Sequence, residues 1–194
     1  LCGVVGLKPT YGRVSLRGVM PLSWSVDHAG PITKTVRDAA LLLQVISGYD
    51  EEDPGSFNIL NGDFMGHLKD TIKGRKVGMV VGDYIEESDP EVLQAVHEAT
   101  RVFASLGVEV KQLEIEWLRE AALNNAIITQ ADGAAFHRAR LQEKPEWFGA
   151  DVRQRLETGA GFTSSEYALA RRKQAELKRR GEMLFESFDL IMLP

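Results

Sequence analysis

The sequence predicts an α/β fold, and three observations lead to this prediction. Residues 76–113 read as a strand, a helix and a second strand, a unit whose two strands usually pair in parallel. Residues 33–48 read as an amphipathic helix with an apolar stripe broad enough to lie on a sheet. The apolar run DLIMLP at 189–194 has the character of a further strand. With 194 residues, 44% of them hydrophobic and 26% charged, the chain has the composition of an ordinary globular domain.

The first 32 residues are expected to form short strands and tight turns rather than a helix. Glycines and prolines recur throughout the segment, with short apolar pieces such as Val4-Val5 between them. Because such a dense apolar stretch is rarely left on a surface, we expect much of it to be packed inside. The helix over 33–48 begins with the T-x-x-D pattern of Thr35 and Asp38, and we expect a left-handed Gly48 to end it.

The rest of the chain alternates between connections, strands and helices. Residues 49–75, which contain the acidic turn GYDEEDPGS, are expected to be a surface connection with at most short helical turns. In the strand–helix–strand unit, Asp89 is the expected N-cap of the helix and Gly107 the residue that ends it. Further helices are predicted at 116–142, within 145–162, and from Thr163 to Phe188.

Three patterns resemble functional motifs but do not satisfy their chemistry. Gly6 and Lys8 imitate a phosphate-binding loop, but Pro9 removes a backbone N–H that the phosphates would need. His97 begins like a zinc-binding H-E-x-x-H motif, but Arg101 occupies the second histidine position. The basic stretch ALARRKQAELKRRGEM is interspersed with glutamates and reads as a solvated helix face. We therefore expect neither a nucleotide site nor a metal site.

Charge and hydropathy narrow the classes of partner. The formal net charge of -5 argues against a nucleic-acid partner and an anionic membrane surface. The longest apolar runs fall far short of the ~20 residues that span a bilayer. The only cysteine, Cys2, excludes an intrachain disulfide, and we expect a reducing, cytoplasmic setting. Because the chain enters and leaves through apolar segments, we expect it to be an internal piece of a larger α/β protein.

Asp27 is the first candidate site residue. It stands between Val26 and His28 in a segment that we expect to be buried, and a buried carboxylate needs a cation or several hydrogen-bond donors. One interpretation is that Asp27 orients a catalytic group. The other is that it forms a structural ion pair or caps a turn, and the sequence does not separate the two.

Residues 2–54, from CGVVGLKPTYGRV to SGYDEEDP, closely resemble the amidase signature family, whose members hydrolyse amide carbon–nitrogen bonds. The later segments DPEVLQAVHEATRVFASLGVEV, GADVRQRLETGAGFTSSEYALARRKQAEL and DLIMLP are also similar to that family, so the resemblance covers nearly the whole chain. It implies a mixed β-sheet flanked by helices on both faces. Within it, 1–48 would be a core segment that follows the nucleophile region, 49–75 a connection, and 76–194 the strand–helix–strand unit and the late helices of a single amidase domain.

The resemblance also implies a mechanism without a metal or organic cofactor. The family uses a Ser–cis-Ser–Lys triad, in which the lysine is the base, the cis-serine relays the proton and the second serine attacks the carbonyl. None of these residues can be placed in this chain, because the family pattern puts them before the equivalent of Leu1. Lys8 does not match the catalytic lysine, nor does Ser15, Ser23 or Ser25 match either serine. We expect the 194 residues alone to be inactive.

The family includes general amidases and the A subunit of glutamyl-tRNA(Gln) amidotransferase. The segment VMPLSWSVDHAGP resembles the general amidases more closely, and the Tyr-Asp-Gly pattern of the tRNA subunits is incomplete around Asp132. By resemblance, Asp27, Ser25 and Asp132 are the residues expected to line or support the substrate pocket, with Asp27 pairing with an arginine after the nucleophile. The substrate would be a small-molecule amide. A homodimer and an assembly with amidotransferase partner subunits both remain open.

Overall fold

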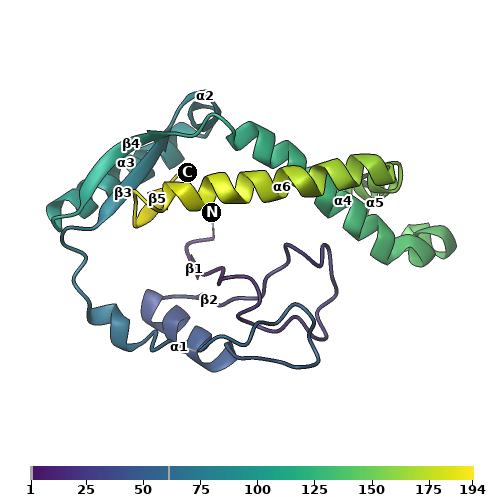
Figure 1. Ribbon diagram of the computed structural model, residues 1–194, viewed down its shortest axis with the longest axis horizontal. Coiled ribbons are helices and arrows are strands. Elements are labelled where there is room, and N and C mark those ends of the chain that lie inside the picture. The colour runs from purple at the N-terminus through teal and green to yellow at the C-terminus, as the bar shows by residue number, and fades with distance from the viewer. Residues whose placement is uncertain (1, 61) are drawn as a thin grey trace. The chain divides into compact units, whose positions relative to one another are not determined.

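The computed structural model describes residues 2–60 and 62–194, and these fold into two compact units. The first unit contains residues 1–70 and 129–161, and the second contains 71–128 and 162–194. Helix α4 (Leu118–Glu143) contributes residues to both units. The predicted α/β fold is confirmed: parallel and antiparallel strand pairs are both present, together with helices (Figure 1).

The second unit is built on a three-stranded parallel sheet with the order β4–β3–β5. Its strands are β3 (Lys76–Val81), β4 (Glu109–Glu114) and β5 (Leu190–Met192). Val77 of the central strand is fully buried and pairs with Val110 on one side and Leu190 on the other. The predicted parallel pairing and the predicted strand within the apolar run at 189–194 are therefore both confirmed.

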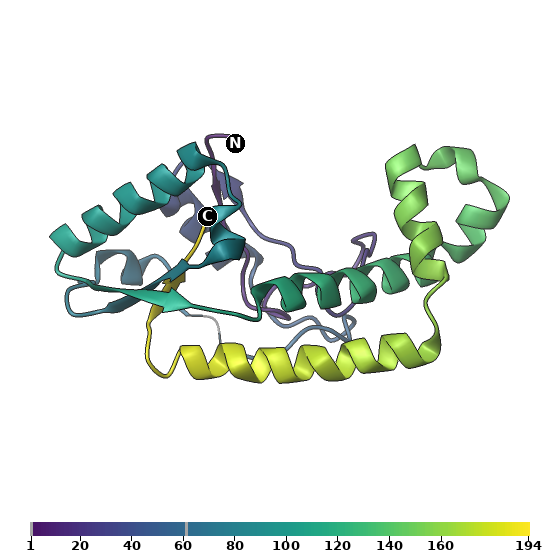
Figure 2. The same cartoon turned by 90° about the horizontal axis from the view of Figure 1, so that it is seen from above.

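Helix α3 (Pro90–Ser105) makes the crossover between β3 and β4 and covers one face of the sheet (Figure 2). The predicted cap is present, because the Asp89 carboxylate accepts the N–H of Glu91 at 2.8 Å. Gly107 follows the helix with φ +82°, the left-handed conformation expected of a residue after a helix end. A one-turn helix, α2 (Asp83–Glu86), was not predicted, because four residues are too few to show a periodic apolar stripe.

Two long helices complete the second unit, as predicted. Helix α6 (Ser164–Leu184) begins with a capping box in which the Thr163 hydroxyl and the Glu166 carboxylate bond each other's backbone N–H groups. Near the start of α4, the Asn124 amide donates to the carbonyl of Ala170 at 3.0 Å. This contact joins the first part of α4 to the first part of α6.

The first unit contains a small antiparallel pair, β1 (Val5–Gly6) with β2 (Ile32–Thr33), followed by helix α1 (Val36–Ile46). The predicted N-cap is confirmed, since the Thr35 hydroxyl accepts the N–H of Asp38 at 3.1 Å. The predicted left-handed Gly48 is wrong. The helix ends at an extended Ser47, and the Gly48 N–H then donates to the carbonyl of Arg13 at 3.0 Å.

The expectation that much of the first 32 residues is packed inside is also wrong for the residues that the structure describes. Among the described residues 2–31, the buried ones are Pro9, Gly12, Ser23 and Pro31. The physical reason is that two-residue strands provide little surface to pack against. The segment is held instead by backbone hydrogen bonds to the residues that follow α1, such as the Phe57 N–H to the carbonyl of Gly12 at 2.9 Å.

The remaining elements of the first unit are short. The connection 49–75 contains the single helical turn η1 (Gly66–Lys69), as predicted, and residue 61 of this connection lies outside the described residues. After α4 come the turn η2 (Pro145–Trp147) and the predicted short helix α5 (Ala150–Ala160). Helix α5 crosses α4 so closely that a Cβ added to Gly159 would lie 2.0 Å from the carbonyl oxygen of Gln130.

Candidate functional site

The turn at residues 22–27 is organised by the carboxylate of Asp27. Its Oδ2 atom accepts the N–H groups of Leu22 at 2.8 Å and Ser23 at 3.0 Å. The carbonyl of Ser23 in turn accepts the N–H groups of Val26 and Asp27. Asp27 therefore closes a compact turn through its own backbone neighbours and is half-buried. Ser25 lies on the same turn and is also half-buried.

Ser23 joins this turn to helix α4. Its side chain is fully buried, and its hydroxyl donates to Oδ2 of Asp132 at 2.5 Å, a bond between residues 109 positions apart. Asp132 is itself only 6% exposed. A hydrogen bond to a buried carboxylate is worth more than one to a neutral group, because the charge has little water around it. Ser23 thus connects two of the predicted site residues, Asp27 and Asp132.

Close packing reinforces the same junction. Gly133 follows Asp132 on α4, and a Cβ added to it would lie 3.2 Å from Cδ1 of Leu22 and 3.3 Å from Cδ2 of Leu156. A glycine at this position lets the turn approach the helix backbone. Ser23 was not among the site residues predicted from the sequence. Its only sequence signal is a small polar side chain between two large apolar ones, Leu22 and Trp24.

A row of rings extends from the turn along the first unit. Trp24 meets Phe136 edge to face with centroids 6.2 Å apart, Phe136 meets His137 at 4.8 Å, and His137 meets Phe148 at 5.3 Å. Burial lowers the pKa of His137 below its usual value, and the nearby positive charge of Arg140 lowers it further. Both effects favour the neutral form of the imidazole.

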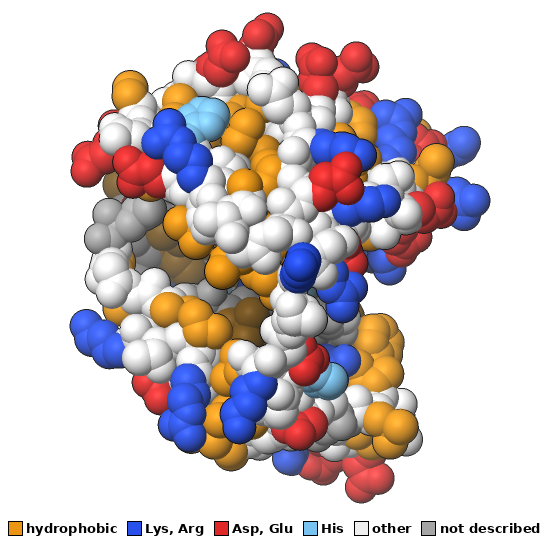
Figure 3. Space-filling view, turned by 90° about the vertical axis from the view of Figure 1, so that its left-hand side faces the viewer, with side chains coloured by type: hydrophobic (Ala, Val, Ile, Leu, Met, Phe, Trp, Pro, Cys, Tyr) orange, Lys and Arg blue, Asp and Glu red, His pale blue; other side chains and the backbone are white. Residues whose placement is uncertain are grey.

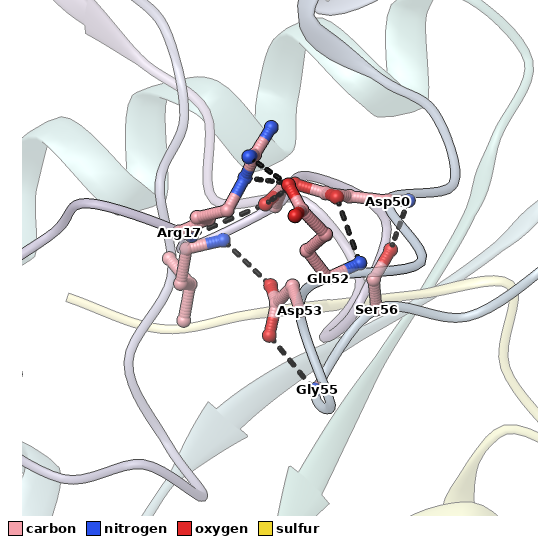
Figure 4. A network of polar contacts seen from close by, with 8 residues as sticks. Arg17, Asp50, Glu52, Asp53, Gly55 and Ser56 are labelled. Atoms are coloured by element: carbon pink, nitrogen blue, oxygen red, sulfur yellow. Dashed lines mark hydrogen bonds and ion pairs between the residues drawn. The ribbon is translucent and has the colours of Figure 1, made fainter.

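The acidic turn after α1, at residues 50–53, forms hydrogen bonds and ion pairs with residues 15–17, which precede the turn at 22–27 (Figure 4). Asp50 accepts from the Ser15 hydroxyl at 2.7 Å and forms an ion pair with Arg17 at 3.0 Å, and Arg17 also pairs with Glu52. Asp53 accepts the N–H groups of Leu16 at 2.7 Å and Gly55 at 2.8 Å. The hydrogen bond from Ser15, that from the Glu52 N–H and the charge of Arg17 together lower the pKa of Asp50.

A cavity of about 510 Å³ lies between the acidic turn after α1 and the turn at 22–27. The residues that line it include the aromatic Tyr11 and Trp24 and the acidic Asp27 and Asp53. Its volume falls within the ~300–1,000 Å³ that is usual for small-molecule sites. Of the three predicted site residues, Asp27 lines this cavity, Asp132 supports its wall through Ser23, and Ser25 belongs to the same turn.

The described residues hold neither a metal-binding cluster nor a membrane-spanning helix. Among residues 2–60 and 62–194, no group of three or more His, Cys, Asp or Glu side chains has the arrangement of a metal site. None of the described helices is long and apolar enough to cross a membrane. Lys8, whose motif imitates a phosphate loop, turns its ammonium group back to the carbonyl of Pro9 at 3.1 Å.

Comparison with known proteins identifies relatives along the whole sequence. The family model named Amidase matches residues 1–194. An amidase from Pseudomonas putida is 37% identical over 195 aligned positions, which cover 100% of this chain and 42% of that protein. The A subunit of glutamyl-tRNA(Gln) amidotransferase from Trichlorobacter lovleyi is 34% identical over 217 positions, covering 100% of this chain and 45% of that protein. The chain thus spans less than half the length of these relatives.

Solved structures agree on the fold. A chain from a vestigial protein complex, which reveals the evolutionary origins of an s-triazine catabolic enzyme, superposes with a TM-score of 0.91 at 29% identity. The alignment covers 100% of this chain and 42% of that one. The A subunit of glutamyl-tRNA(Gln) amidotransferase from Thermotoga maritima superposes with a TM-score of 0.73 at 30% identity, covering 98% of this chain and 42% of that one.

Proposed function

The chain belongs to the amidase family, and on this premise we propose that it forms part of an enzyme that hydrolyses amide carbon–nitrogen bonds other than peptide bonds. The observation that carries the proposal is the family match over all residues 1–194. The identity of 37% to an amidase from Pseudomonas putida supports it. This chain aligns with 42% of that relative, so we propose that the activity also requires residues other than these 194.

The proposed mechanism is that of a Ser–cis-Ser–Lys triad supplied from outside these residues. The lysine accepts a proton through the cis-serine, and the deprotonated serine attacks the amide carbonyl, because a hydroxyl is a poor nucleophile until a base takes its proton. Backbone N–H groups stabilise the resulting oxyanion. The lysine returns this proton through the cis-serine to the leaving nitrogen as the carbon–nitrogen bond breaks, which releases the amine. Water then hydrolyses the acyl-enzyme to the carboxylate and restores the serine hydroxyl. On this proposal the chain alone is inactive.

The part played by this chain is to build and support the wall of the substrate pocket. We assign Asp27 and Ser25 to the pocket wall and Asp132 to its support, because the Ser23–Asp132 bond holds their turn on α4. Asp27 lines the cavity beside this turn, and no cationic side chain among the described residues forms an ion pair with it. In this arrangement residues 1–194 make one continuous part of a single amidase domain.

The exposed surface of the chain supports a larger assembly. Its solvent-accessible area is 13405 Å², whereas a globular protein of 21.5 kDa exposes about 9,200 Å². Two separate globules of half that mass would together expose only about 11,000 Å², so the excess does not arise from the division into two units. Apolar side chains are exposed among charged ones on the face in Figure 3. The remainder of an amidase fold would cover such surface.

A second candidate function is that of an A subunit in a tRNA-dependent amidotransferase, which would place the chain in a multi-subunit assembly. The identity of 34% to such a protein from Trichlorobacter lovleyi favours it. Alignment length favours the general amidase instead. The amidase aligns over 195 positions against the 194 residues of this chain, whereas the amidotransferase protein requires 217, which implies gaps within this chain. The exposed Cys2 and the -5 net charge suit the cytoplasmic location that we propose.

Two measurements on the native protein and on the 194-residue chain test this proposal. The native protein, isolated with any subunits that copurify, is expected to release amine or ammonia from small amides. A fluorophosphonate probe is expected to label a serine outside residues 1–194. The chain alone should show neither property, and amide hydrolysis by it would contradict the placement of the triad. A native protein that neither hydrolyses amides nor reacts with the probe would refute the amidase proposal. Copurifying subunits and transfer of ammonia to a glutamyl-tRNA would establish the second candidate.

A further inference from the structure

The cavity beside the 22–27 turn has two kinds of wall. Aliphatic side chains (Leu16, Val19 and Pro21) and the rings of Tyr11 and Trp24 make it largely apolar. The acidic residues Asp27, Glu52 and Asp53 line the same cavity. A pocket of about 510 Å³ with apolar walls and a few fixed polar groups is the usual design of a small-molecule site.

The aromatic walls are fixed in position. The Tyr11 hydroxyl donates to the carbonyl of Trp24 at 2.7 Å, which ties the two sides of the cavity together. The Tyr11 ring meets His28 and Phe57 edge to face at 5.6 Å and 5.9 Å. Gly12, with φ +75°, brings the chain so close to Gly55 that an added Cβ would lie 2.6 Å from the Gly55 carbonyl oxygen. The cavity is therefore largely formed before a ligand arrives.

The charge of the cavity is negative. Its cation, Arg17, is neutralised by ion pairs with Asp50 and Glu52 (Figure 4). Asp27 and Asp53 each accept two backbone N–H groups, and among the described residues neither is in an ion pair with a cationic side chain. Two acidic residues without a cationic partner among the described residues thus line a space that Tyr11 and Trp24 also line.

From these three observations we propose that the cavity binds an organic cation with an apolar body, an alkyl or arylalkyl ammonium group. The apolar walls remove its hydrocarbon part from water, the ring faces attract its charge, and the carboxylates balance that charge. This inference rests on the proposed function: the occupant would be an amine-bearing part of the amide substrate or the amine that hydrolysis releases. Amides that carry a carboxylate at the same position are excluded.

Direct binding of probes tests the proposal without requiring hydrolysis. The native protein is titrated by calorimetry with 2-phenylethylammonium, with the anionic 3-phenylpropionate, which has the same phenylethyl body, and with neutral 2-phenylethanol. We expect the cation to bind with one-to-one stoichiometry and about tenfold more tightly than the anion, a difference of about 1.4 kcal/mol. Equal affinities for cation and anion, or no binding of the cation at about 10 mM, would overturn the proposal. The second result is expected if polypeptide fills the cavity in the native enzyme.

Two substitutions assign the probe to this cavity. Trp24→Ala removes one ring wall and should weaken cation binding at least about fivefold, whereas Trp147→Ala, at an exposed tryptophan outside the cavity, should not. Asp27→Asn keeps a side-chain oxygen for the turn and should weaken the cation but not the neutral alcohol. Asp89→Asn, at a helix cap, is its control. Weakening by both members of either pair would refute the assignment.

The cavity proposal and the amidase proposal fail separately. If amides are hydrolysed but the ammonium probe does not bind, the cavity proposal alone is refuted. If the probe binds as described but no amide is hydrolysed, the amidase proposal alone is refuted. The comparison of cation with anion on the unmodified protein also stands by itself should Trp24→Ala fail to fold, which circular dichroism would reveal.

Discussion

At the scale of single residues, the organisation of the candidate site depends on Ser23. Its backbone N–H donates to Asp27, its carbonyl accepts two N–H groups of the turn, and its hydroxyl donates to Asp132. A residue that contributes three kinds of hydrogen bond from a fully buried position is difficult to replace. The catalytic groups of the proposed mechanism lie elsewhere, so the effect of Ser23 is on the position of the pocket wall.

Replacing Ser23 with alanine should therefore destabilise the fold. The buried Asp132 carboxylate loses a charge-assisted hydrogen bond, and we expect the free energy of unfolding to fall by about 1–3 kcal/mol. Urea denaturation followed by circular dichroism measures the change. Ser165→Ala, at an exposed position, is the matched control and should stay within about 0.5 kcal/mol of the unmodified protein. Equal effects of the two substitutions would show that the buried bond contributes nothing.

His137 should make stability depend on pH near neutrality. Its Nδ1 atom is buried without a hydrogen-bond partner among the described atoms, and burial lowers its pKa. Because the unfolded chain then takes up the proton first, stability is full above the unfolded pKa of about 6.5. It falls as the pH decreases through that value toward the folded pKa. Ring resonances in NMR should titrate with a midpoint below about 6.5, and His137→Phe should reduce the loss of stability between pH 7.5 and 5.5. A midpoint at or above that of free histidine would contradict this account.

At the scale of secondary-structure elements, close crossings and caps determine how the helices are placed. The helices α1, α3 and α6 all begin at capping residues, and each cap satisfies backbone N–H groups that a helix start leaves without partners. The crossing of α4 and α5 depends instead on the absence of a side chain at Gly159. Caps are visible in a sequence, whereas a crossing requires two distant segments to meet.

Gly159→Ala should separate α4 from α5. A Cβ there would meet the backbone of Gln130 at 2.0 Å, and a backbone atom cannot move aside as a flexible side chain can. We expect a loss of about 1–3 kcal/mol or more, observed as a lower melting temperature. Gly48→Ala is the control, because an added Cβ has no atom within 4 Å and the backbone does not need a glycine there. Unchanged stability of Gly159→Ala would show that the two helices do not cross this closely.

At the scale of the whole molecule, the exposed area of 13405 Å² is the property that most needs explanation. Helix α1 illustrates it. Its face containing Ala39, Ala40 and Leu43 is buried, yet Val36 is 61% and Val45 73% exposed. An apolar stripe that continues around a helix indicates contact on more than one side. The described residues provide only one of these contacts, and the proposed remainder of the amidase fold would provide the other.

The isolated chain should therefore associate with itself or bind an apolar dye. We expect 1-anilinonaphthalene-8-sulfonate to fluoresce strongly with it, and the apparent mass to rise with concentration in light scattering. Val45→Lys should reduce both signals, because it places a charge on the exposed apolar face of α1. The control is Ala95→Lys, which adds the same charge at an exposed position on α3. A monodisperse monomer without dye binding would mean that the exposed surface needs no partner.

Most of the elements could be predicted from the sequence, because their signals are local. Caps at Thr35, Asp89 and Thr163 and the apolar periodicity that follows each of them are properties of a few neighbouring residues. The parallel pairing of β3 with β4 follows from the length of the crossover between them. The prediction that Gly48 is left-handed was wrong because its conformation depends on a contact that is not local. A hydrogen bond to Arg13, which is distant in the sequence, sets the path of the chain after α1.

By itself, then, the sequence determined the family, the α/β class and the nature of nearly every helix and strand, since all of these depend on local pattern. It also directed attention to Asp27, Ser25 and Asp132. Only the tertiary structure showed that Asp27 and Asp132 meet through Ser23, that few of the described residues 2–32 are buried, and that an anionic, aromatic cavity lies beside the turn. These features arise from contacts between residues up to 109 positions apart, and no local pattern encodes such contacts.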